Sequence, residues 1–207
     1  MENRPYTVVV WGDSIAASGW PQKTEFILNV ALNLGRTVRV VNEGVGGMPA
    51  AKARHLFEEK IRPHAPDLVI VQFGFNDARY DGSRDRLPIS TLPEFRDHLA
   101  AMIGACRQVG AEVLVFGNHP ARRIHRMPDG RPATDVYAEY ARMAGTTARE
   151  RGVRFFSLAD GFAAVGWAAD DFLSEDGVHL SPRGLEGYAQ MAADQIQSVM
   201  VETGVVR

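Results

Sequence analysis

The fold is decided by the stretch Tyr6–Ser14, which reads YTVVVWGDS. Its first six residues are apolar or β-branched without alternation, which is typical of a strand buried on both faces. Gly12 ends the run, and a serine directly after a buried strand can lie on a tight turn with its hydroxyl exposed at the sheet edge. Asp13 and Ser14 are also common helix caps, so the stretch alone leaves both a nucleophile and a cap open.

Strand-like and helix-like patterns alternate along the rest of the chain. Four further apolar runs are predicted to be strands: Thr37–Val41, Asp67–Phe73, Glu112–Phe116 and Val153–Phe156. Helical spacing or helix start signals mark Pro21–Leu34 (with Phe26, Val30 and Leu34 on one face), Ala50–Ile61, Thr91–Val109, Thr134–Arg151, a short segment at Asp160–Val165, and a last segment from Ser181 to about Val201. This alternation implies right-handed crossovers and a parallel sheet between two layers of helices.

The length of 207 residues suits one domain spanning residues 1–207, since neither a repeat nor a Pro/Ser-rich linker divides the chain. Two predicted loops are long: Gly74–Ser90 and Gly117–Ala133. Long loops in small domains are usually functional, and both follow the carboxyl ends of strands, where open α/β sheets bind ligands.

Composition excludes several classes of protein. The chain has 23 Lys+Arg against 25 Asp+Glu, a net charge of −2, which argues against a nucleic-acid-binding protein. Its single cysteine, Cys106, rules out an intramolecular disulfide and a cysteine-based metal cluster. No apolar run approaches the ~20 residues of a membrane span, and no signal-peptide pattern opens the chain, so we expect a cytoplasmic protein. The oligomeric state cannot be read from the sequence.

Polar residues that suit acyl transfer follow three of the predicted strands and also occur just before the last predicted helix. The C-terminal stretch Asp176-Gly177-Val178-His179 places an acid three residues before a histidine, a spacing that lets the carboxylate orient the imidazole. Oxyanion donors would come from the glycine-rich turn Asn42–Gly47 and from Asn76 in Gly74-Phe75-Asn76-Asp77. Each block alone is an ordinary turn, whereas together they supply a nucleophile, donors and a base.

Four blocks, taken in chain order, resemble the SGNH hydrolases, also called the GDSL esterase/lipase family. They are Gly12-Asp13-Ser14-Ile15, the glycine-rich turn that ends in Gly47, Gly74-Phe75-Asn76-Asp77 and Asp176-Gly177-Val178-His179. The resemblance covers residues from about 6 to about 190. It implies a flavodoxin-like three-layer α/β/α sandwich whose five parallel strands have the order 2-1-3-4-5. It also implies a Ser-His-Asp triad of Ser14, His179 and Asp176, and an oxyanion hole made by the backbone N–H groups of Ser14 and Gly47 and the side chain of Asn76.

Two departures from the family pattern concern the first two blocks. Ile15 stands where the family has its eponymous leucine, which is a conservative change. The second block reads Gly46-Gly47-Met48-Pro49, so a shift of register would place Gly46 or Gly44 at the oxyanion hole instead of Gly47.

The resemblance implies a serine esterase that needs no metal or cofactor and acts on a small-molecule or carbohydrate ester. A short acyl group such as acetyl is favoured, because the chain is small and carries no long apolar lid. A lysophospholipase or a thioesterase of the same family is the alternative. A non-catalytic flavodoxin-like binding module is a weaker one, because Ile15–Trp20 matches a phosphate-binding loop poorly.

Charged residues beside the expected site are candidates for substrate binding. The loop Asn118–Pro132 is rich in arginine and also contains His125, and an acidic run at Trp167–Gly177 is expected to flank the same strand ends. The candidates are Asp13, Asp77, His119, Arg122, Arg123 and Arg126, with Arg131 as a further arginine of the loop.

Overall fold

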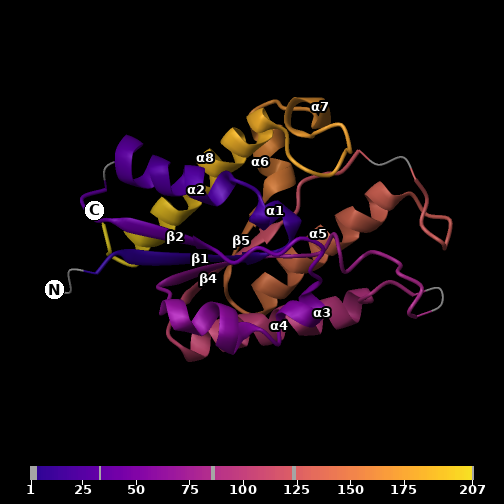
Figure 1. The fold of residues 1–207 in the computed structure, drawn as a ribbon, viewed down its shortest axis with the longest axis horizontal. Coiled ribbons are helices and arrows are strands. Elements are labelled where there is room, and N and C mark those ends of the chain that lie inside the picture. The colour runs from indigo at the N-terminus through magenta and orange to yellow at the C-terminus, as the bar shows by residue number, and fades with distance from the viewer. Residues whose placement is uncertain (1–3, 33, 85–86, 123–124, 207) are drawn as a thin grey trace.

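A computed structural model describes residues 4–32, 34–84, 87–122 and 125–206. Its centre is a five-stranded sheet in which every pair of neighbouring strands is parallel, with the order β2-β1-β3-β4-β5 (Figure 1). The strands are β1 (Tyr6–Gly12), β2 (Val38–Asn42), β3 (Leu68–Gln72), β4 (Glu112–Gly117) and β5 (Arg154–Ser157). The expected strand order and α/β class are therefore confirmed.

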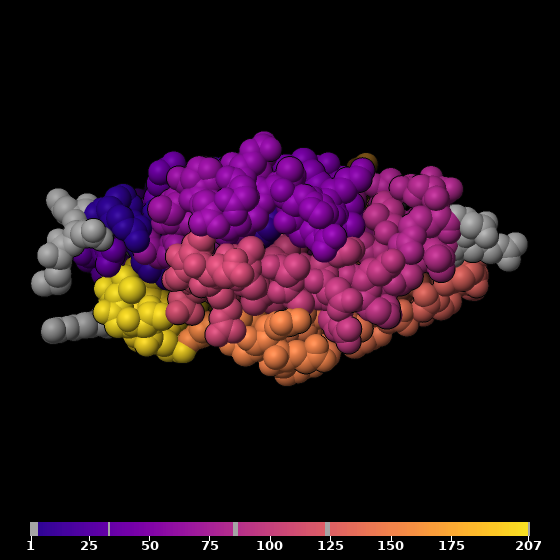
Figure 2. Space-filling view, turned by 90° about the horizontal axis from the view of Figure 1, so that it is seen from below, coloured from indigo at the N-terminus to yellow at the C-terminus, as the bar shows by residue number. Residues whose placement is uncertain are grey.

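Helices cover both faces of the sheet (Figure 1). One face carries α2 (Trp20–Phe26), α6 (Leu158–Ala164) and α8 (Pro182–Glu202). The other carries α3 (Ala50–Ala53), α4 (Leu92–Gln108) and α5 (Ala133–Glu150), and Figure 2 shows these helices side by side from outside. The short elements are α1 (Ser14–Ala17), η1 (Ile27–Ala31), η2 (Phe57–Ile61), η3 (Arg62–His64) and α7 (Ala169–Phe172).

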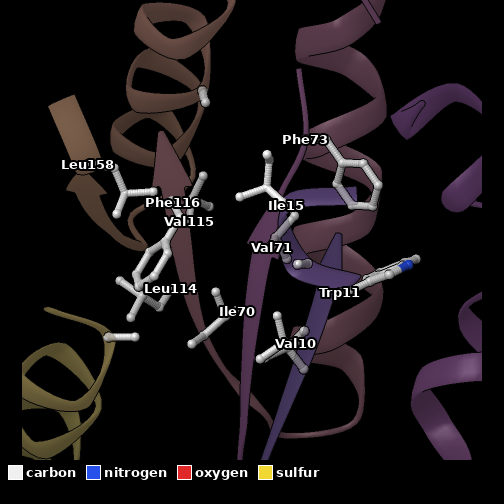
Figure 3. Packing of buried hydrophobic residues seen from close by; sticks show 14 of the residues in the cluster. Val10, Trp11, Ile15, Ile70, Val71, Phe73, Leu114, Val115, Phe116 and Leu158 are labelled. Atoms are coloured by element: carbon white, nitrogen blue, oxygen red, sulfur yellow. The ribbon is translucent and has the colours of Figure 1, made fainter. Parts of the chain in front are cut away.

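The core forms where side chains of neighbouring strands stand side by side (Figure 3). Val10, Ile70 and Leu114 are register partners across β1, β3 and β4, and all three are buried. Trp11 points to the opposite face, where its ring lies 6.0 Å from that of Phe57. Every residue of β1 is buried, which confirms the interpretation of its unbroken apolar run.

The start of α4 follows the capping signal in the sequence. The backbone N–H of Thr91 donates to the Glu94 carboxylate at 2.7 Å, and the Thr91 hydroxyl donates to the same oxygen at 2.8 Å. These bonds tie the cap residue Thr91 to Glu94 in the first turn as part of a capping box, so the helix begins where the pattern predicted.

The helix predicted over Pro21–Leu34 differs from expectation in its buried face. It consists of α2 followed by the wider turn of η1, and Phe26 and Val30 are 63% and 60% exposed. The buried stripe contains Thr24, whose hydroxyl donates to carbonyls of Trp20 and Ala189 at 3.0 and 3.2 Å. A hydroxyl whose hydrogen bonds are satisfied can face the core, so the spacing of apolar residues alone predicts the wrong face here.

The single helix predicted over Ala50–Ile61 is also wrong. The structure has α3, a break after Ala53, and then the π-helical turn η2 from Phe57 to Ile61. Ala50, Ala53, Phe57 and Ile61 are nevertheless all buried, as an amphipathic helix would require. Apolar spacing predicts which side chains face the core, but it does not determine whether the backbone turns between them are regular.

The two long loops lie beyond the carboxyl ends of β3 and β4 and project from the same end of the sheet (Figure 1). They meet where the Tyr80 hydroxyl donates to the Asp129 carboxylate at 3.3 Å. None of the helices in the described ranges carries an apolar stretch long enough to cross a bilayer.

Candidate active site

Ser14 lies at the tight turn between β1 and α1. Asp13 caps α1, and its carboxylate accepts from the Ile15 N–H at 2.9 Å. The turn requires Gly12, because a Cβ there would lie 2.6 Å from the Ala16 Cβ and 2.8 Å from the Gln72 carbonyl oxygen. The sequence left open whether this stretch supplies a helix cap or an exposed serine hydroxyl, and it supplies both. Asp13 caps the helix, and the half-buried Ser14 keeps its hydroxyl available at the sheet edge.

The predicted histidine and its acid meet Ser14. His179 Nε2 lies 3.0 Å from Ser14 Oγ, and His179 Nδ1 lies 2.5 Å from Asp176 Oδ2. A carboxylate only accepts hydrogen bonds, so Nδ1 carries the proton and Nε2 is left to accept from the serine hydroxyl. Residues 165 positions apart in the chain thus form a continuous Ser-His-Asp row.

The Asp176 carboxylate is held as an anion by its neighbours. Burial works against its charge, but the side chain of His179, the backbone N–H groups of Val178 and His179, and the Ser174 hydroxyl all donate to it. Together these bonds keep the pKa of Asp176 well below its usual range. The acid is therefore ionised at neutral pH, as required of a group that orients an imidazole and stabilises its cationic form.

Ser14 and His179 open into a cavity of about 330 Å³. Gly47 and Asn76, which are expected to supply oxyanion donors together with the Ser14 N–H, lie on its wall. The full lining is Ser14, Gly47, Phe75, Asn76, Arg79, Tyr137, Val178 and His179. Neither of the alternatives in the glycine-rich turn, Gly44 and Gly46, is among the lining residues. Gly44 packs against α1, where a Cβ would lie 2.2 Å from the Ala17 nitrogen.

The amide of Asn76 is held at both ends. Its Nδ2 donates to Asp13 Oδ2 at 3.2 Å, and its Oδ1 accepts from Arg79 Nη1 at 3.3 Å. These two contacts fix which end of the amide is the donor. One hydrogen of Nδ2 is used by Asp13, and the second is available to a ligand in the cavity.

The candidate substrate-binding acids lie behind the cavity, not on its surface. Asp13 and Asp77 are both fully buried, and neither lines the cavity. Burial, with a smaller contribution from Asp77, raises the pKa of Asp13 to about 7. Asp77 accepts from the Ala50 N–H at 3.0 Å and the Ser90 hydroxyl at 2.8 Å, so it ties the loop after β3 to α3, and burial raises its pKa as well. The structure assigns both carboxyls to support of the site.

His119 is likewise a supporting residue in this structure. It is 2% exposed, and its Nε2 donates to the carbonyl of Val178 at 2.8 Å, directly before His179. Burial lowers the pKa of His119 to about 4, which leaves its imidazole neutral at pH 7. Its ring packs edge-on against Phe75 and Phe172. It therefore braces the loop that carries His179 and does not face the cavity.

The arginine-rich loop lies outside the cavity. Arg122 forms an ion pair with Asp170, which confirms that the basic loop and the acidic run lie side by side.

The other arginines of the loop also contact the protein itself. The guanidinium of Arg126 donates to the carbonyl of Gly130 at 2.6 Å. Arg131 forms ion pairs with Asp129 and Glu139. Arg123 falls outside the described residues. The described arginines of the loop are thus engaged within the protein and do not line the cavity, contrary to the expectation for substrate-binding residues.

Sequence reasoning missed Arg79, Phe75 and Tyr137, which all line the cavity. Phe75 directly precedes Asn76 within the third block and Arg79 follows that block by two residues, so their positions could have drawn attention to them. Tyr137 comes from α5, and its ring lies 5.1 Å from that of Phe75. No signal in the sequence of α5 distinguishes this tyrosine from an ordinary core residue.

Comparison with known proteins gives the family. The model of the GDSL-like lipase/acylhydrolase family matches residues 10–186. The structure is similar to that of a lipase/acylhydrolase from Enterococcus faecalis, with a TM-score of 0.76 and 25% sequence identity over 93% of this chain and 95% of that chain. An acetylxylan esterase from Geobacillus stearothermophilus has a similar fold, with a TM-score of 0.77 and 20% identity over 92% of this chain and 94% of that chain. Among curated proteins, none matches the sequence. The chain therefore belongs to the GDSL-like lipase/acylhydrolase family and is a carboxylic-ester hydrolase of that family.

Proposed function

We propose that the protein is a serine esterase in which Ser14, His179 and Asp176 form the catalytic triad and the acyl group removed is short. One observation carries the proposal: His179 Nε2 lies within hydrogen-bond distance of Ser14 Oγ while its Nδ1 contacts Asp176, at the wall of an open cavity. A serine hydroxyl is a weak nucleophile until an oriented base accepts its proton, and this geometry supplies that base.

In the proposed acylation step, Ser14 Oγ attacks the ester carbonyl carbon and His179 Nε2 takes the serine proton. The carbonyl oxygen becomes an oxyanion that accepts from the backbone N–H groups of Ser14 and Gly47 and from the free hydrogen of Asn76 Nδ2. When the tetrahedral intermediate collapses, the alkoxide leaves with the proton held by His179, and the acyl group stays on Ser14.

Deacylation reverses the same proton path. A water molecule enters in place of the alcohol, gives a proton to His179 Nε2 and attacks the acyl carbon. The second collapse returns that proton to Ser14 Oγ and releases the carboxylic acid. Asp176 stays ionised throughout and stabilises the imidazolium that forms in each step.

The size of the cavity favours a short acyl group. A volume of about 330 Å³ lies at the low end of the 300–1,000 Å³ of small-molecule sites, and the scissile group, the acyl chain and part of the alcohol must share it. Acetyl esters, including those of carbohydrates, are therefore the proposed substrates. The Geobacillus stearothermophilus protein of similar fold is an acetylxylan esterase, which agrees with this proposal. A lysophospholipase or thioesterase would need to place a long acyl chain outside this cavity.

The proposal is tested by kcat/KM for 4-nitrophenyl esters from acetyl to dodecanoyl, beside acetylated xylose and an acyl-CoA. We expect the highest kcat/KM for acetyl or propionyl. Ser14→Ala is expected to abolish turnover, whereas Ser198→Ala, on α8 and bonded to Glu202, should leave it unchanged. Ester hydrolysis by pure Ser14→Ala protein near the wild-type rate would refute the triad, and a preference for dodecanoyl or acyl-CoA would refute the short acyl group.

A further inference from the structure

Arg79 is an exposed cation on the wall of the catalytic cavity. Its guanidinium donates to Asn76 Oδ1 at 3.3 Å, so its charge lies one side chain away from the place proposed for the oxyanion. A guanidinium has five N–H donors in a planar fork, and this contact uses one of them. The remaining donors are free to bind a ligand that enters the cavity.

Arg79 differs from the arginines of the loop after β4. Arg122 and Arg131 are both paired with carboxylates of the protein. Across the described ranges, no carboxylate forms an ion pair with Arg79, and the cavity lining among these residues contains neither Asp nor Glu. The positive charge beside the nucleophile is therefore not neutralised at close range.

The backbone that carries Arg79 is fixed relative to the site. The Arg79 N–H donates to the Asn76 carbonyl at 3.2 Å, and the Arg79 carbonyl accepts from the Ile89 N–H at 2.8 Å. The same loop is tied down by the buried Asp77 and its bond from Ser90. A side chain on such a turn is confined to the region of the cavity instead of being dispersed in solvent.

We infer that Arg79 binds an anionic group, a carboxylate or a phosphate, carried by the ester near its scissile bond, and so gives the enzyme a preference for anionic esters. Planar guanidinium groups suit both anions, because they can donate two parallel hydrogen bonds. The inference rests on the proposed function, since it places the anion beside the proposed oxyanion donor.

The test compares each anionic ester with the methyl ester of its carboxylate, which removes the charge. An anion on the alcohol side is provided by 4-acetoxybenzoate, with methyl 4-acetoxybenzoate as its neutral partner. An anion on the acyl side is provided by mono-4-nitrophenyl adipate, with its methyl ester as the neutral partner. For each pair we measure the ratio of kcat/KM, anionic over neutral, in wild type, Arg79→Gln, Arg79→Lys and the loop control Arg126→Gln. Removing the bond from Arg79 to Asn76 can lower kcat/KM for every ester, and the ratio cancels this common decrease.

We expect Arg79→Gln to lower this ratio about tenfold for at least one pair, mainly through KM, as for the loss of a charge-assisted bond at a partly solvated site. Arg79→Lys should retain part of the preference for the anionic ester, and Arg126→Gln should leave the ratio unchanged. Added salt should lower the ratio in wild type but not in Arg79→Gln, because screening weakens an exposed charge pair. The pair that responds identifies the side of the ester that carries the anion.

Three outcomes would overturn the inference. The first is a ratio that stays within twofold of wild type in Arg79→Gln for both pairs, while all four esters are hydrolysed in a Ser14-dependent reaction; this leaves the proposed function intact. The second is an equal decrease of this ratio in Arg126→Gln, which would indicate that the preference arises from the overall charge distribution of the protein and not from Arg79. The third is the absence of Ser14-dependent hydrolysis of every ester, which would remove the proposed function and this inference together.

Discussion

The carboxylate of Asp13 accepts a hydrogen bond from Asn76 Nδ2 at a distance of 3.2 Å. The residue directly before the proposed nucleophile thereby holds the side chain proposed to bind the oxyanion. Asp13 also caps α1, the helix that begins with Ser14. A single buried carboxyl thus links the positions of two groups that must meet the same carbonyl of the substrate, and substitution of this residue is informative.

Asp13→Asn should lower kcat without a matching rise in KM. Asparagine is an equally good N-cap, so the oxygen that accepts from the Ile15 N–H is retained. Its NH₂ group, however, would face the NH₂ group of Asn76, and two donors repel. We expect kcat for 4-nitrophenyl acetate to fall about tenfold to a hundredfold, less than the ~10²–10³-fold expected for Asn76→Ala, which removes the donor entirely. A kcat within twofold of wild type would show that Asp13 does not position Asn76.

The same variant should change how stability depends on pH. Burial raises the pKa of Asp13 to about 7, whereas an aspartate in the unfolded chain has a pKa of about 3.9. Between these values the folded protein binds a proton that the unfolded chain releases, so this contribution to stability is present at low pH and is lost as the pH rises through 7. Asparagine cannot titrate. The unfolding free energy of Asp13→Asn relative to wild type should therefore increase between pH 5 and pH 8, by on the order of 2 kcal/mol.

Urea unfolding of both proteins at the two pH values measures this difference. Contributions from Asp77 and His119, which titrate in both proteins, cancel to first order in the comparison. A difference that does not change with pH would mean that Asp13 is ionised in the folded protein throughout this range.

His119→Phe should destabilise the loop that carries His179, the proposed catalytic base. Phenylalanine retains the packing against Phe75 and Phe172 but leaves the carbonyl of Val178 without its donor. We expect a loss of about 1–3 kcal/mol in the free energy of unfolding, as for other buried acceptors left unpaired. His119→Gln, which offers an N–H donor, is the matched variant and should lose less. Equal stability of the two variants would show that the bond to Val178 is not what holds this loop.

Two neighbouring glycines should respond differently to the same substitution. A Cβ on Gly44 would lie 2.2 Å from the backbone nitrogen of Ala17, so Gly44→Ala must push the turn after β2 away from α1. A Cβ on Gly46 meets no atom within 4 Å, so Gly46→Ala should fold normally. Thermal unfolding followed by circular dichroism should show a melting temperature several degrees lower for Gly44→Ala, consistent with overpacking costs of about 1–3 kcal/mol. Equal melting temperatures would mean that the turn can move away at no cost.

The sheet and the proximity of Ser14 and Asn76 were predictable for a common reason, whereas the place of His179, in the segment between α7 and α8, came only from the family resemblance. Uninterrupted apolar runs indicate strands buried on both faces, and parallel strands bring their carboxyl ends to one edge. Polar residues that directly follow such runs therefore lie close together in space, however far apart they are in the chain. The family resemblance then set the strand order, which five apolar runs alone leave open.

The remaining features depend on contacts that no local pattern encodes. Thr24 faces the core because a carbonyl of α8 accepts from its hydroxyl. His119 is buried because three aromatic rings surround it, whereas its loop reads as polar. Arg79 reaches the cavity because the loop after β3 turns back through Asp77 and Ser90. In each case the position of the side chain follows from packing between segments distant in sequence.

The most direct test of the central claim is the site of covalent labelling by a fluorophosphonate. Wild-type protein is treated with the reagent, and the adduct is mapped by mass spectrometry of its peptides, with Ser14→Ala and Ser198→Ala proteins treated alongside. We expect one adduct, on Ser14, formed in wild type and Ser198→Ala and absent from Ser14→Ala. It should form at least tenfold more slowly in His179→Ala because the base is missing. An adduct on another residue, or equal labelling of Ser14→Ala and wild type, would contradict the assignment of Ser14 as the nucleophile.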